Sequence, residues 1–311
     1  MSTFALLSGI RYTTAMKKES KQNILLIGST GFTGGRVLNQ LNVRDDVQIT
    51  CMLRPHSTAP EINTGHCTIV RGDLNDIESI KAALSGKDGM IYVASLGFGH
   101  AGNIVTACEE MGIKKCVFTS TTALLTKLNA SSKKVRLAAE KTISNSKLLN
   151  WTIVRPTMIY GLKGDRNMER LLKYIQKWPF LFVPGSANSL QQPNHVDDVA
   201  SALIGAYFSP HSKNKIYNIS GEKPLTFKDI VRTICEESGH KTRIISIPLT
   251  PCLWLLKPYE WLANKPRIKG EQLLRLNENK DFSHAEAQKD FDFKPKSFKT
   301  GIQQLIKSLN T

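Results

Sequence analysis

The chain has 311 residues, 41% of them hydrophobic and 22% charged, which is typical of a globular protein rather than of a disordered one. Its formal net charge of +16 at pH 7 favours encounters with anions such as nucleotides or phosphorylated sugars. No apolar run approaches the ~18–20 residues that a membrane-spanning helix needs, and the basic residues are not interleaved with aromatic ones, so we expect small anionic ligands rather than nucleic acid.

The first 22 residues form a basic extension, with Arg11, Lys17, Lys18 and Lys21 against the single acid Glu19. This composition loosely resembles an organelle-targeting segment. A simpler alternative, which we favour, is that translation starts at residue 16. In either case we expect residues 1–22 to be disordered or wrongly assigned to the protein, with the fold beginning at residue 23.

The six cysteines are spread through the chain without a C-x-x-C pair and without zinc-like spacing to histidine. Several of them fall in apolar runs, where a thiol behaves as a small hydrophobic group. We therefore expect reduced thiols in a cytoplasmic protein, and no metal site.

A glycine-rich turn follows the first predicted strand, residues 24–27. Gly28, Gly31 and Gly34 then precede a helix predicted over 36–42. In a dinucleotide-binding turn the first glycine permits the tight turn, the second lets the backbone approach a pyrophosphate, and the third lets the helix pack on the strand. The spacing is G-x-x-G-x-x-G rather than G-x-G-x-x-G. The alternative is an ordinary glycine-containing turn, which the strand before and the helix after make the weaker interpretation.

Strands and helices alternate after this turn, which predicts right-handed crossovers and a parallel sheet covered on both faces. We expect an α/β, doubly wound Rossmann domain over residues 23–165, with ligands at the carboxyl ends of its strands. The further strands are predicted at 47–53, 67–70, 89–94, 116–119 and 151–155.

Arg54 directly follows the second predicted strand, 20 positions after Gly34. NAD-specific domains usually place an acid near this position to bind the ribose 2′-hydroxyl, whereas arginine suits a 2′-phosphate. Arg54, with His56 beside it, therefore favours NADP(H) over NAD(H). The alternative is a solvated loop arginine.

The next two strand ends also carry candidate cofactor contacts. Asp73 and Leu74 follow the third strand, where the Asp73 carboxylate has two compatible uses: capping the next helix or accepting a hydrogen bond from adenine. Ala94 and Ser95 follow the fourth strand, and their small side chains leave room for a crossing dinucleotide.

An ordered set of motifs resembles the extended and atypical short-chain dehydrogenases, a group that includes nucleotide-sugar epimerases and dehydratases. The resemblance covers the chain from about residue 22 to its C-terminus. The motifs are Gly28-Ser-Thr-Gly-Phe-Thr-Gly34, Gly72-Asp-Leu74, Phe118-Thr-Ser-Thr121, Leu137-Ala-Ala-Glu140, Trp151-Thr-Ile-Val-Arg-Pro-Thr157 with Tyr160-Gly161, and His195-Val-Asp-Asp-Val-Ala200.

The resemblance implies an NAD(P)-dependent oxidoreductase or epimerase that moves a hydride between nicotinamide and a sugar nucleotide or similar carbonyl or alcohol. Ser120 or Thr121 would occupy the position of the family's substrate-polarising hydroxyl. The implied cofactor-binding residues are Gly28, Thr30, Gly31, Phe32, Thr33, Gly34, Arg54, Asp73, Leu74, Ala94, Ser95 and Pro156.

The chain departs from the family at the tyrosine and lysine that normally transfer the proton. Aligning the family's helix places Ser132 at the tyrosine and Arg136 at the lysine. A serine hydroxyl has no comparably accessible oxyanion, and arginine stays protonated while it binds a ribose hydroxyl or a phosphate. Lys133 or Lys134 is a second candidate at this position, although paired lysines before a helix usually form a solvated entry. Tyr160 offers a phenol from another side, and its alternative is a packed aromatic residue.

Residues 166–311 predict mainly a substrate lobe, with 190–220 returning to the Rossmann core. Its expected elements are helices at 167–177, 196–207 and 226–237 and strands at 179–184, 216–219 and 243–248. His195 is expected to be a structural hydrogen-bonding residue, and Asp197 supplies favourable charge to a first helical turn. We expect the substrate between the lobes, near Ser120, Tyr160 and Gln191.

Residues 250–263 are rich in leucine and tryptophan, with lysines beside them. This composition suits a membrane-surface helix. Because Pro251 and Pro258 interrupt the stretch, buried packing in the lobe is the interpretation we favour. The C-terminal residues 281–309 resemble the family's structural tail.

Two functions stay open at this level. The first is an enzyme of the class named above, and the second is a non-catalytic NADP(H)-binding sensor or assembly scaffold. The intact cofactor half favours the enzyme, whereas the missing tyrosine and lysine favour the scaffold. A homodimer is a further expectation.

Overall fold

Seven parallel strands form the central sheet of the protein, seen here in a computed structural model that describes residues 21–57, 67–128, 131–147, 150–263 and 270–310. The strand order is β11-β6-β5-β4-β1-β2-β3. The strands are β1 (Gln22–Ile27), β2 (Val47–Leu53), β3 (Cys67–Arg71), β4 (Gly89–Tyr92), β5 (Lys115–Thr119), β6 (Trp151–Pro156) and β11 (Lys215–Ile219).

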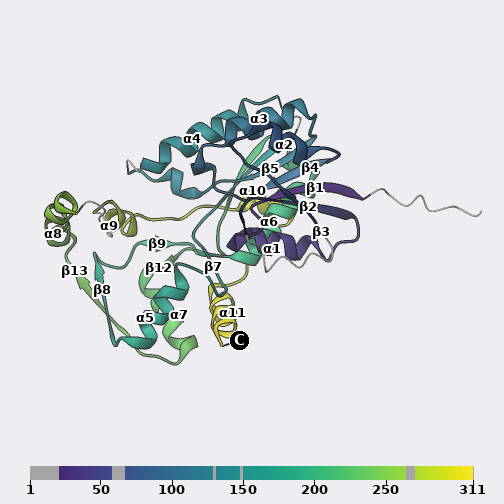
Figure 1. The fold of residues 1–311 in the computed structure, drawn as a ribbon. Helices are drawn as coiled ribbons and strands as arrows, with labels where there is room; N and C mark the ends of the chain where they lie inside the picture. The colour runs from purple at the N-terminus through teal and green to yellow at the C-terminus, as the bar shows by residue number, and fades with distance from the viewer. Residues whose placement is uncertain (1–20, 58–66, 129–130, 148–149, 264–269, 311) are drawn as a thin grey trace, which may run out of the picture.

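Both faces of this sheet are covered by helices, because side chains of a strand alternate between the faces. Ile24 and Leu26 pack with α1 (Phe32–Leu41), α6 (Val196–Phe208) and α10 (Ala285–Phe291), while Leu25 and Ile27 pack with the helices of the other face. Those are α2 (Ile77–Leu84), α3 (Ala101–Glu110) and α4 (Ser131–Ser144), which lie above the sheet in Figure 1. This arrangement confirms the predicted doubly wound Rossmann fold.

A second group of elements lies below the sheet in Figure 1. Its core consists of α5 (Met168–Lys177), α7 (Phe227–Ser238) and α11 (Phe298–Leu309). Three two-stranded pairs surround them: β7 (Ile159–Tyr160) with β10 (Asn194–His195), β8 (Phe180–Pro184) with β13 (Arg243–Ile247), and β9 (Leu190–Gln191) with β12 (Leu225–Thr226). The remaining helices are α8 (Leu249–Leu262), α9 (Gly270–Leu276) and the 3₁₀ turns Leu96–Phe98, Thr122–Leu125 and Pro210–Ser212.

Helix α8 differs from the sequence prediction in two ways. It is a single helix despite its two prolines, since Pro251 lies in the first turn, where no N–H is needed, and only Pro258 lies inside. None of its residues is buried, so the expected buried packing is wrong. Within the described residues, no helix combines the length and apolar character needed to cross a membrane.

One ion pair joins the edge strand β11 to helix α10. Asp290 Oδ2 accepts hydrogen bonds from Lys215 Nζ at 2.7 Å and from the Tyr217 hydroxyl at 2.5 Å. These two donors hold the pKa of the Asp290 carboxyl below its ordinary value of 3.8.

Because this pKa is depressed in the fold, the carboxylate stabilises the protein above about pH 3.8 and that contribution is lost as the pH falls further. Asp290→Asn should therefore lower the melting temperature at pH 7, and the difference from wild type should shrink toward pH 3. Asp292→Asn is the control, because the Asp292 pair with Lys294 is exposed and contributes little. A pH-independent difference for Asp290→Asn would contradict the ionic origin.

Candidate functional site

A cavity of about 1260 Å³ opens at the carboxyl ends of β1, β4, β5 and β6. Pockets for single small ligands measure roughly 300–1000 Å³, so this cavity has the volume for a dinucleotide and part of a second molecule. Its walls come from the glycine turn, the ends of the central strands, the start of α5 and Arg275 of α9.

The glycine turn forms the floor of this cavity. Gly28 has φ of +92°, and a Cβ placed on Gly34 would lie 1.9 Å from the carbonyl oxygen of Gly28. Helix α1 begins at Phe32, earlier than predicted, so Gly34 lies within its first turn and packs directly on the turn backbone. That first turn has no side-chain cap and no acidic residue. Its N–H groups therefore fit an anion such as a pyrophosphate.

The predicted cofactor residues fall into three groups. Gly28 and Gly34 shape the turn, while the cavity is lined by Thr30, Gly31, Phe32, Thr33, Ala94, Ser95 and Pro156. Arg54, Asp73 and Leu74 do not line this cavity but follow β2 and β3 at the same edge of the sheet. Their roles in binding stay predictions.

Arg71, which the sequence analysis did not single out, holds the loop that contains Arg54. Its Nη1 donates to the carbonyl oxygens of Pro55 at 2.8 Å, Ser57 at 3.1 Å and Arg54 at 3.3 Å. The Arg54 and His56 side chains are exposed. Two guanidinium groups thus lie beside the end of β2, where the second ribose of a dinucleotide lies in Rossmann domains.

Asp73 does not cap the following helix. Its Oδ1 accepts hydrogen bonds from the backbone and side-chain amides of Asn75, at 2.9 and 3.0 Å, whereas Asp76 caps α2. Asp73 remains exposed, which leaves the predicted contact with adenine open.

Ser120, one of the two predicted substrate-polarising hydroxyls, lies in the cavity wall at the end of β5. Among the described residues, the buried Ser120 Oγ and the neighbouring Thr119 Oγ1 have no hydrogen-bond partner. Thr121 also lines the cavity, but its hydroxyl accepts from the Ala123 amide at 3.1 Å and caps a 3₁₀ turn. Buried polar groups normally have partners, so of the two predicted hydroxyls Ser120, and not Thr121, is the one that remains available to a ligand.

Arg136 projects from α4 into the same cavity. A Cβ on Gly97 would lie 3.4 Å from its Cζ, which places the guanidinium against the turn that follows β4. One helical turn later, Glu140 receives two hydrogen bonds from Arg155 of β6 and fixes the helix on the sheet. Ser132 lies in the first turn of α4.

The two lysines at the start of this helix, Lys133 and Lys134, do not replace the missing family lysine. Lys133 Nζ donates to the carbonyl oxygen of Thr126 at 2.5 Å, and neither Lys133 nor Lys134 lines the cavity. Lys134 is exposed, as expected of a solvated helix entry.

Tyr160 lies away from the cavity, so the structure favours the packed-aromatic alternative over a catalytic phenol. The side chain is 1% exposed, its hydroxyl donates to the Phe298 carbonyl at 3.3 Å, and its ring packs edge-on against His195. Burial also raises the pKa of this phenol far above its ordinary value. Gln191 is buried elsewhere, and so of the expected group of Ser120, Tyr160 and Gln191 only Ser120 lines the cavity.

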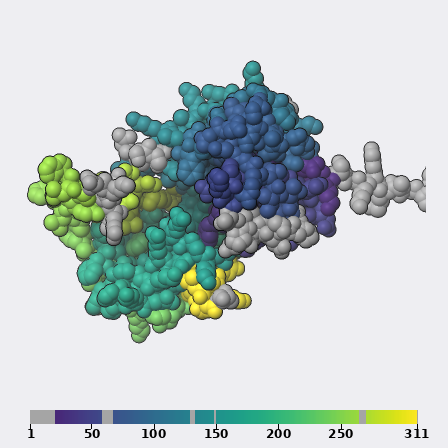
Figure 2. Space-filling view, in the orientation of Figure 1, coloured from purple at the N-terminus to yellow at the C-terminus, as the bar shows by residue number. Residues whose placement is uncertain are grey.

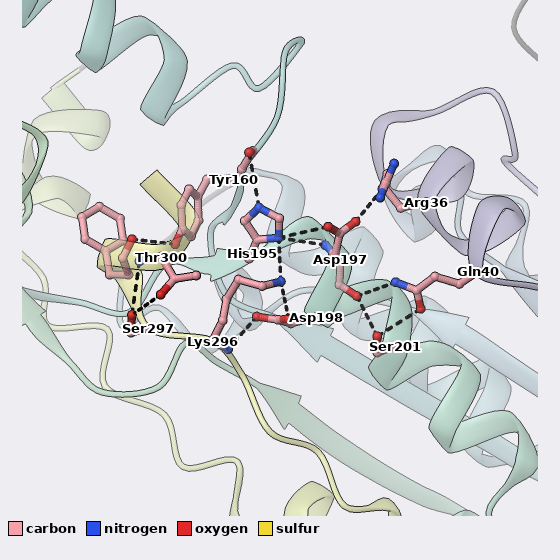
Figure 3. A network of polar contacts seen from close by, with 12 residues as sticks. Arg36, Gln40, Tyr160, His195, Asp197, Asp198, Ser201, Lys296, Ser297 and Thr300 are labelled. Atoms are coloured by element: carbon pink, nitrogen blue, oxygen red, sulfur yellow. Dashed lines mark hydrogen bonds and ion pairs between the residues drawn. The ribbon is translucent and has the colours of Figure 1, made fainter. Parts of the chain in front are cut away.

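A polar network connects the cavity to the start of α6 (Figure 3). Arg36, a cavity residue that the sequence analysis missed, donates from Nε to Asp197 Oδ1 at 2.5 Å. Next to it, Lys296 Nζ donates to Asp198 Oδ1 at 2.6 Å and to His195 Nδ1 at 3.1 Å. The network thus joins α1, α6 and the segment before α11.

His195 has a structural role in this network. Its Nδ1 accepts hydrogen bonds, and its Nε2 lies 3.3 Å from the Gly161 carbonyl, which requires a neutral ring with the proton on Nε2. Burial, together with the nearby Lys296 charge, lowers the pKa of His195 and keeps it neutral. Among the described residues, no group of three histidines, cysteines or acids could hold a metal ion.

Two family models match the chain in overlapping stretches. The model described as NAD(P)H-binding matches residues 28–172, and that of the 3-beta hydroxysteroid dehydrogenase/isomerase family matches residues 123–249. The first match contains the glycine turn, Ser120 and Arg136, and the second extends into the lobe that contains α5 and α7.

Individual relatives are distant. One is NADH dehydrogenase (ubiquinone) 1 alpha subcomplex subunit 9, mitochondrial, of Dictyostelium discoideum. It is 24% identical in an alignment of 241 positions that covers 72% of this chain and 66% of that protein, slightly under two thirds of its length. Another is short-chain dehydrogenase/reductase family 42E member 1 of Bos taurus, which is 25% identical in a gapped alignment of 287 positions that covers 75% of this chain and 72% of the relative.

The fold is also found in solved structures of nucleotide-sugar enzymes. UDP-glucuronic acid 4-epimerase from Bacillus cereus, in complex with UDP-glucuronic acid and NAD, superposes with a TM-score of 0.72 at 14% identity and covers 93% of this chain and 99% of its own. Taken together, the fold, the glycine turn and these matches show that the chain resembles the NAD(P)-binding short-chain dehydrogenases/reductases, in particular their epimerase and dehydratase-like members.

Proposed function

We propose that the protein is an NADP(H)-dependent oxidoreductase or epimerase whose substrate is an anionic alcohol or carbonyl compound such as a nucleotide sugar. The observation that carries this proposal is the unpartnered Ser120 hydroxyl, which lies in the same cavity as the glycine turn. A non-catalytic cofactor site needs the turn, but it does not need a free hydroxyl at the end of β5.

The cofactor and the residues of the chain would contribute different parts of the reaction. A bound nicotinamide would supply or accept the hydride. The N–H groups at the start of α1 hold the pyrophosphate, and Ser120 donates a hydrogen bond to the substrate oxygen. Arg136 stays protonated, so it would stabilise negative charge on that oxygen without transferring a proton itself, and the proton that accompanies the hydride would be exchanged with solvent, to which the cavity opens.

An anionic substrate is supported by three cationic side chains in the cavity wall. Lys163 and Arg166, in the segment before α5, and Arg275 of α9 all line the cavity. The one acid beside them, Asp165, accepts hydrogen bonds from the amides of Asn167 and Met168 and is thereby occupied. Guanidinium and ammonium groups in this arrangement suit phosphate or carboxylate groups.

The Ser120 hydroxyl provides the direct test of turnover. Ser120→Ala should lower kcat by roughly 100-fold or more with little change in cofactor affinity, because one donor to the reacting oxygen is lost. Ser120→Thr keeps a hydroxyl and should retain part of the activity. With a panel of sugar nucleotides, the assay follows NADPH absorbance for reduction and chromatographic separation of the sugar nucleotides for epimerisation, and wild-type turnover in Ser120→Ala would refute the assignment.

The preference for NADP(H) is tested at Arg54. Arg54→Asp should lower the affinity for NADPH by about tenfold or more and leave the affinity for NADH unchanged or higher, because the cation beside the 2′-phosphate becomes an acid. The measurement is fluorescence titration with both cofactors. Lys114→Asp, at the opposite end of the sheet, makes the same charge change and should affect neither affinity. Unchanged discrimination in Arg54→Asp would overturn the preference.

A non-catalytic sensor or assembly scaffold is the second candidate. It is supported by Ser132 and Arg136 at the positions of the family's tyrosine and lysine, and by the name of the Dictyostelium relative, a subunit of a larger dehydrogenase. This candidate predicts that NADPH binds but that no sugar nucleotide is reduced or epimerised.

A further inference from the structure

An uncovered apolar stripe runs along helix α8. Trp254, Leu255, Trp261 and Leu262 are between 72% and 85% exposed. With Pro258 they occupy positions i, i+1, i+4, i+7 and i+8, which fall on one side of a helix. Figure 2 shows α8, in light green at the left, projecting from the rest of the molecule.

The opposite side of α8 is already used for packing. A Cβ on Gly270 would lie 3.3 Å from Leu253 Cδ2, and the Glu260 carboxylate accepts a hydrogen bond from the Gly270 amide. Both contacts join α8 to α9. The stripe is therefore a second apolar face, which no described part of the chain covers.

The strand pair before α8 continues this exposed surface. β8 and β13 lie at the same edge of the lobe as α8, away from the central sheet (Figure 1). Phe180 and Phe182 alternate outward along β8 and are 46% and 57% exposed, and Trp178, just before them, is 51% exposed. Lys177 Nζ lies 5.6 Å from the Trp178 ring.

Positive charge accompanies these aromatic side chains. A second cavity, of about 870 Å³, lies beside Phe180, and its charged lining residues are four cations and one acid: Lys228, Arg232, Lys241, Arg243 and Glu236. Arg232 pairs with Asp229, whereas the other three cations have no ion-pair partner among the described residues. Lys257 lies on α8 itself next to the stripe.

We propose that this edge of the lobe docks on an anionic membrane surface, with the α8 stripe inserted at the level of the lipid headgroups. Exposed tryptophan and leucine next to lysine and arginine is the composition of interfacial helices. The 14 residues of α8 are fewer than the ~20 that span a bilayer, so the helix lies along the surface. A second copy is disfavoured, because each copy brings a net charge of +16 and the patch itself is cationic.

The test is flotation of the full-length protein with vesicles of phosphatidylcholine alone or with about 30 mol% phosphatidylglycerol, whose negative surface potential attracts nearby lysine and arginine side chains. We expect flotation with the anionic vesicles only, weakening at high salt, and a blue shift of the tryptophan emission. Trp254→Ser with Trp261→Ser should weaken binding by about tenfold or more. Val43→Ser, which removes a side chain 82% exposed on the other domain, should bind like wild type.

Three results would overturn the proposal. They are no flotation with either vesicle, flotation of the tryptophan variant equal to that of wild type, or light scattering that shows a dimer for wild type and a monomer for the tryptophan variant. Free glycerol phosphate at millimolar concentration should not displace the protein. Displacement by it would indicate a soluble phosphate ligand in the basic cavity instead. NADPH titration of the variants separates this test from the cofactor site, because the stripe lines no part of that cavity.

Discussion

Gly34→Ala should lose at least about 3 kcal/mol of unfolding free energy and should not bind NADPH. The added methyl group would lie 1.9 Å from the Gly28 carbonyl oxygen, and this atom is backbone in a turn whose geometry is fixed by the Gly31 amide bonding to the same carbonyl at 3.0 Å. Helix α1 must then move away from β1, which costs packing energy and displaces the N–H groups that face the pyrophosphate. Urea unfolding and NADPH titration measure the two effects.

Gly102→Ala is the matched control, because it makes the same change in a helix. No atom lies within 4 Å of a Cβ built on Gly102 in α3. Alanine is the better helix former, so this variant should be as stable as wild type or more stable by up to about 1 kcal/mol. Wild-type stability and NADPH affinity in Gly34→Ala would show that α1 does not pack on the turn as described.

Arg155→Met should cost about 3–5 kcal/mol of unfolding free energy, because it leaves the buried Glu140 carboxylate without its partner. Glu140 is 5% exposed and receives hydrogen bonds from Arg155 Nε, at 2.9 Å, and from Nη2. Glu140 holds α4 on the sheet one helical turn after Arg136. Loss of its partner should therefore displace Arg136 and lower turnover as well. Urea unfolding gives the first effect, and the NADPH assay gives the second.

Two further variants separate the buried charge from lost packing. Adding Glu140→Gln to Arg155→Met should restore part of the stability, because a neutral amide costs less to bury than a carboxylate. Lys294→Met breaks the exposed pair with Asp292 and should cost less than about 0.5 kcal/mol. An equally small cost for Arg155→Met would contradict a buried ion pair.

The sequence predicted the Rossmann domain well, because buried parallel strands are short apolar runs that end in recognisable turns. The strand predicted at 47–53 has those bounds in the structure, and the other predicted strands of the central sheet differ only at their ends. Helix α1 begins earlier than predicted, because the sequence pattern assigns the glycines to the turn, whereas Gly34 and Gly35 lie in the helix. The bounds of α8 were close, but its exposure was not predicted, since an apolar composition does not reveal whether another element covers a helix.

The site was predicted less completely than the fold. Ser120, Thr121 and Arg136 were placed by motif alignment, and all three line the cavity. For Tyr160 the sequence left two alternatives open, a catalytic phenol and a packed aromatic residue, because its position shortly after β6 does not show that the C-terminal helix α11 covers it. Arg36 and Arg71 were missed because their partners, Asp197 and the loop after β2, only become adjacent in the fold, although an arginine directly after the glycine turn was a usable signal.

The most direct test of the proposed cofactor site is to identify and quantify the nucleotide that freshly purified protein releases on denaturation, followed by titration of the emptied protein with NADPH and NADH. We expect NADP(H) at up to one equivalent, and tighter binding of NADPH in the titration. Stoichiometric NAD⁺ would contradict the role given to Arg54 and indicate an epimerase that recycles its hydride. A protein that releases no nucleotide and binds neither cofactor would contradict the cofactor site itself.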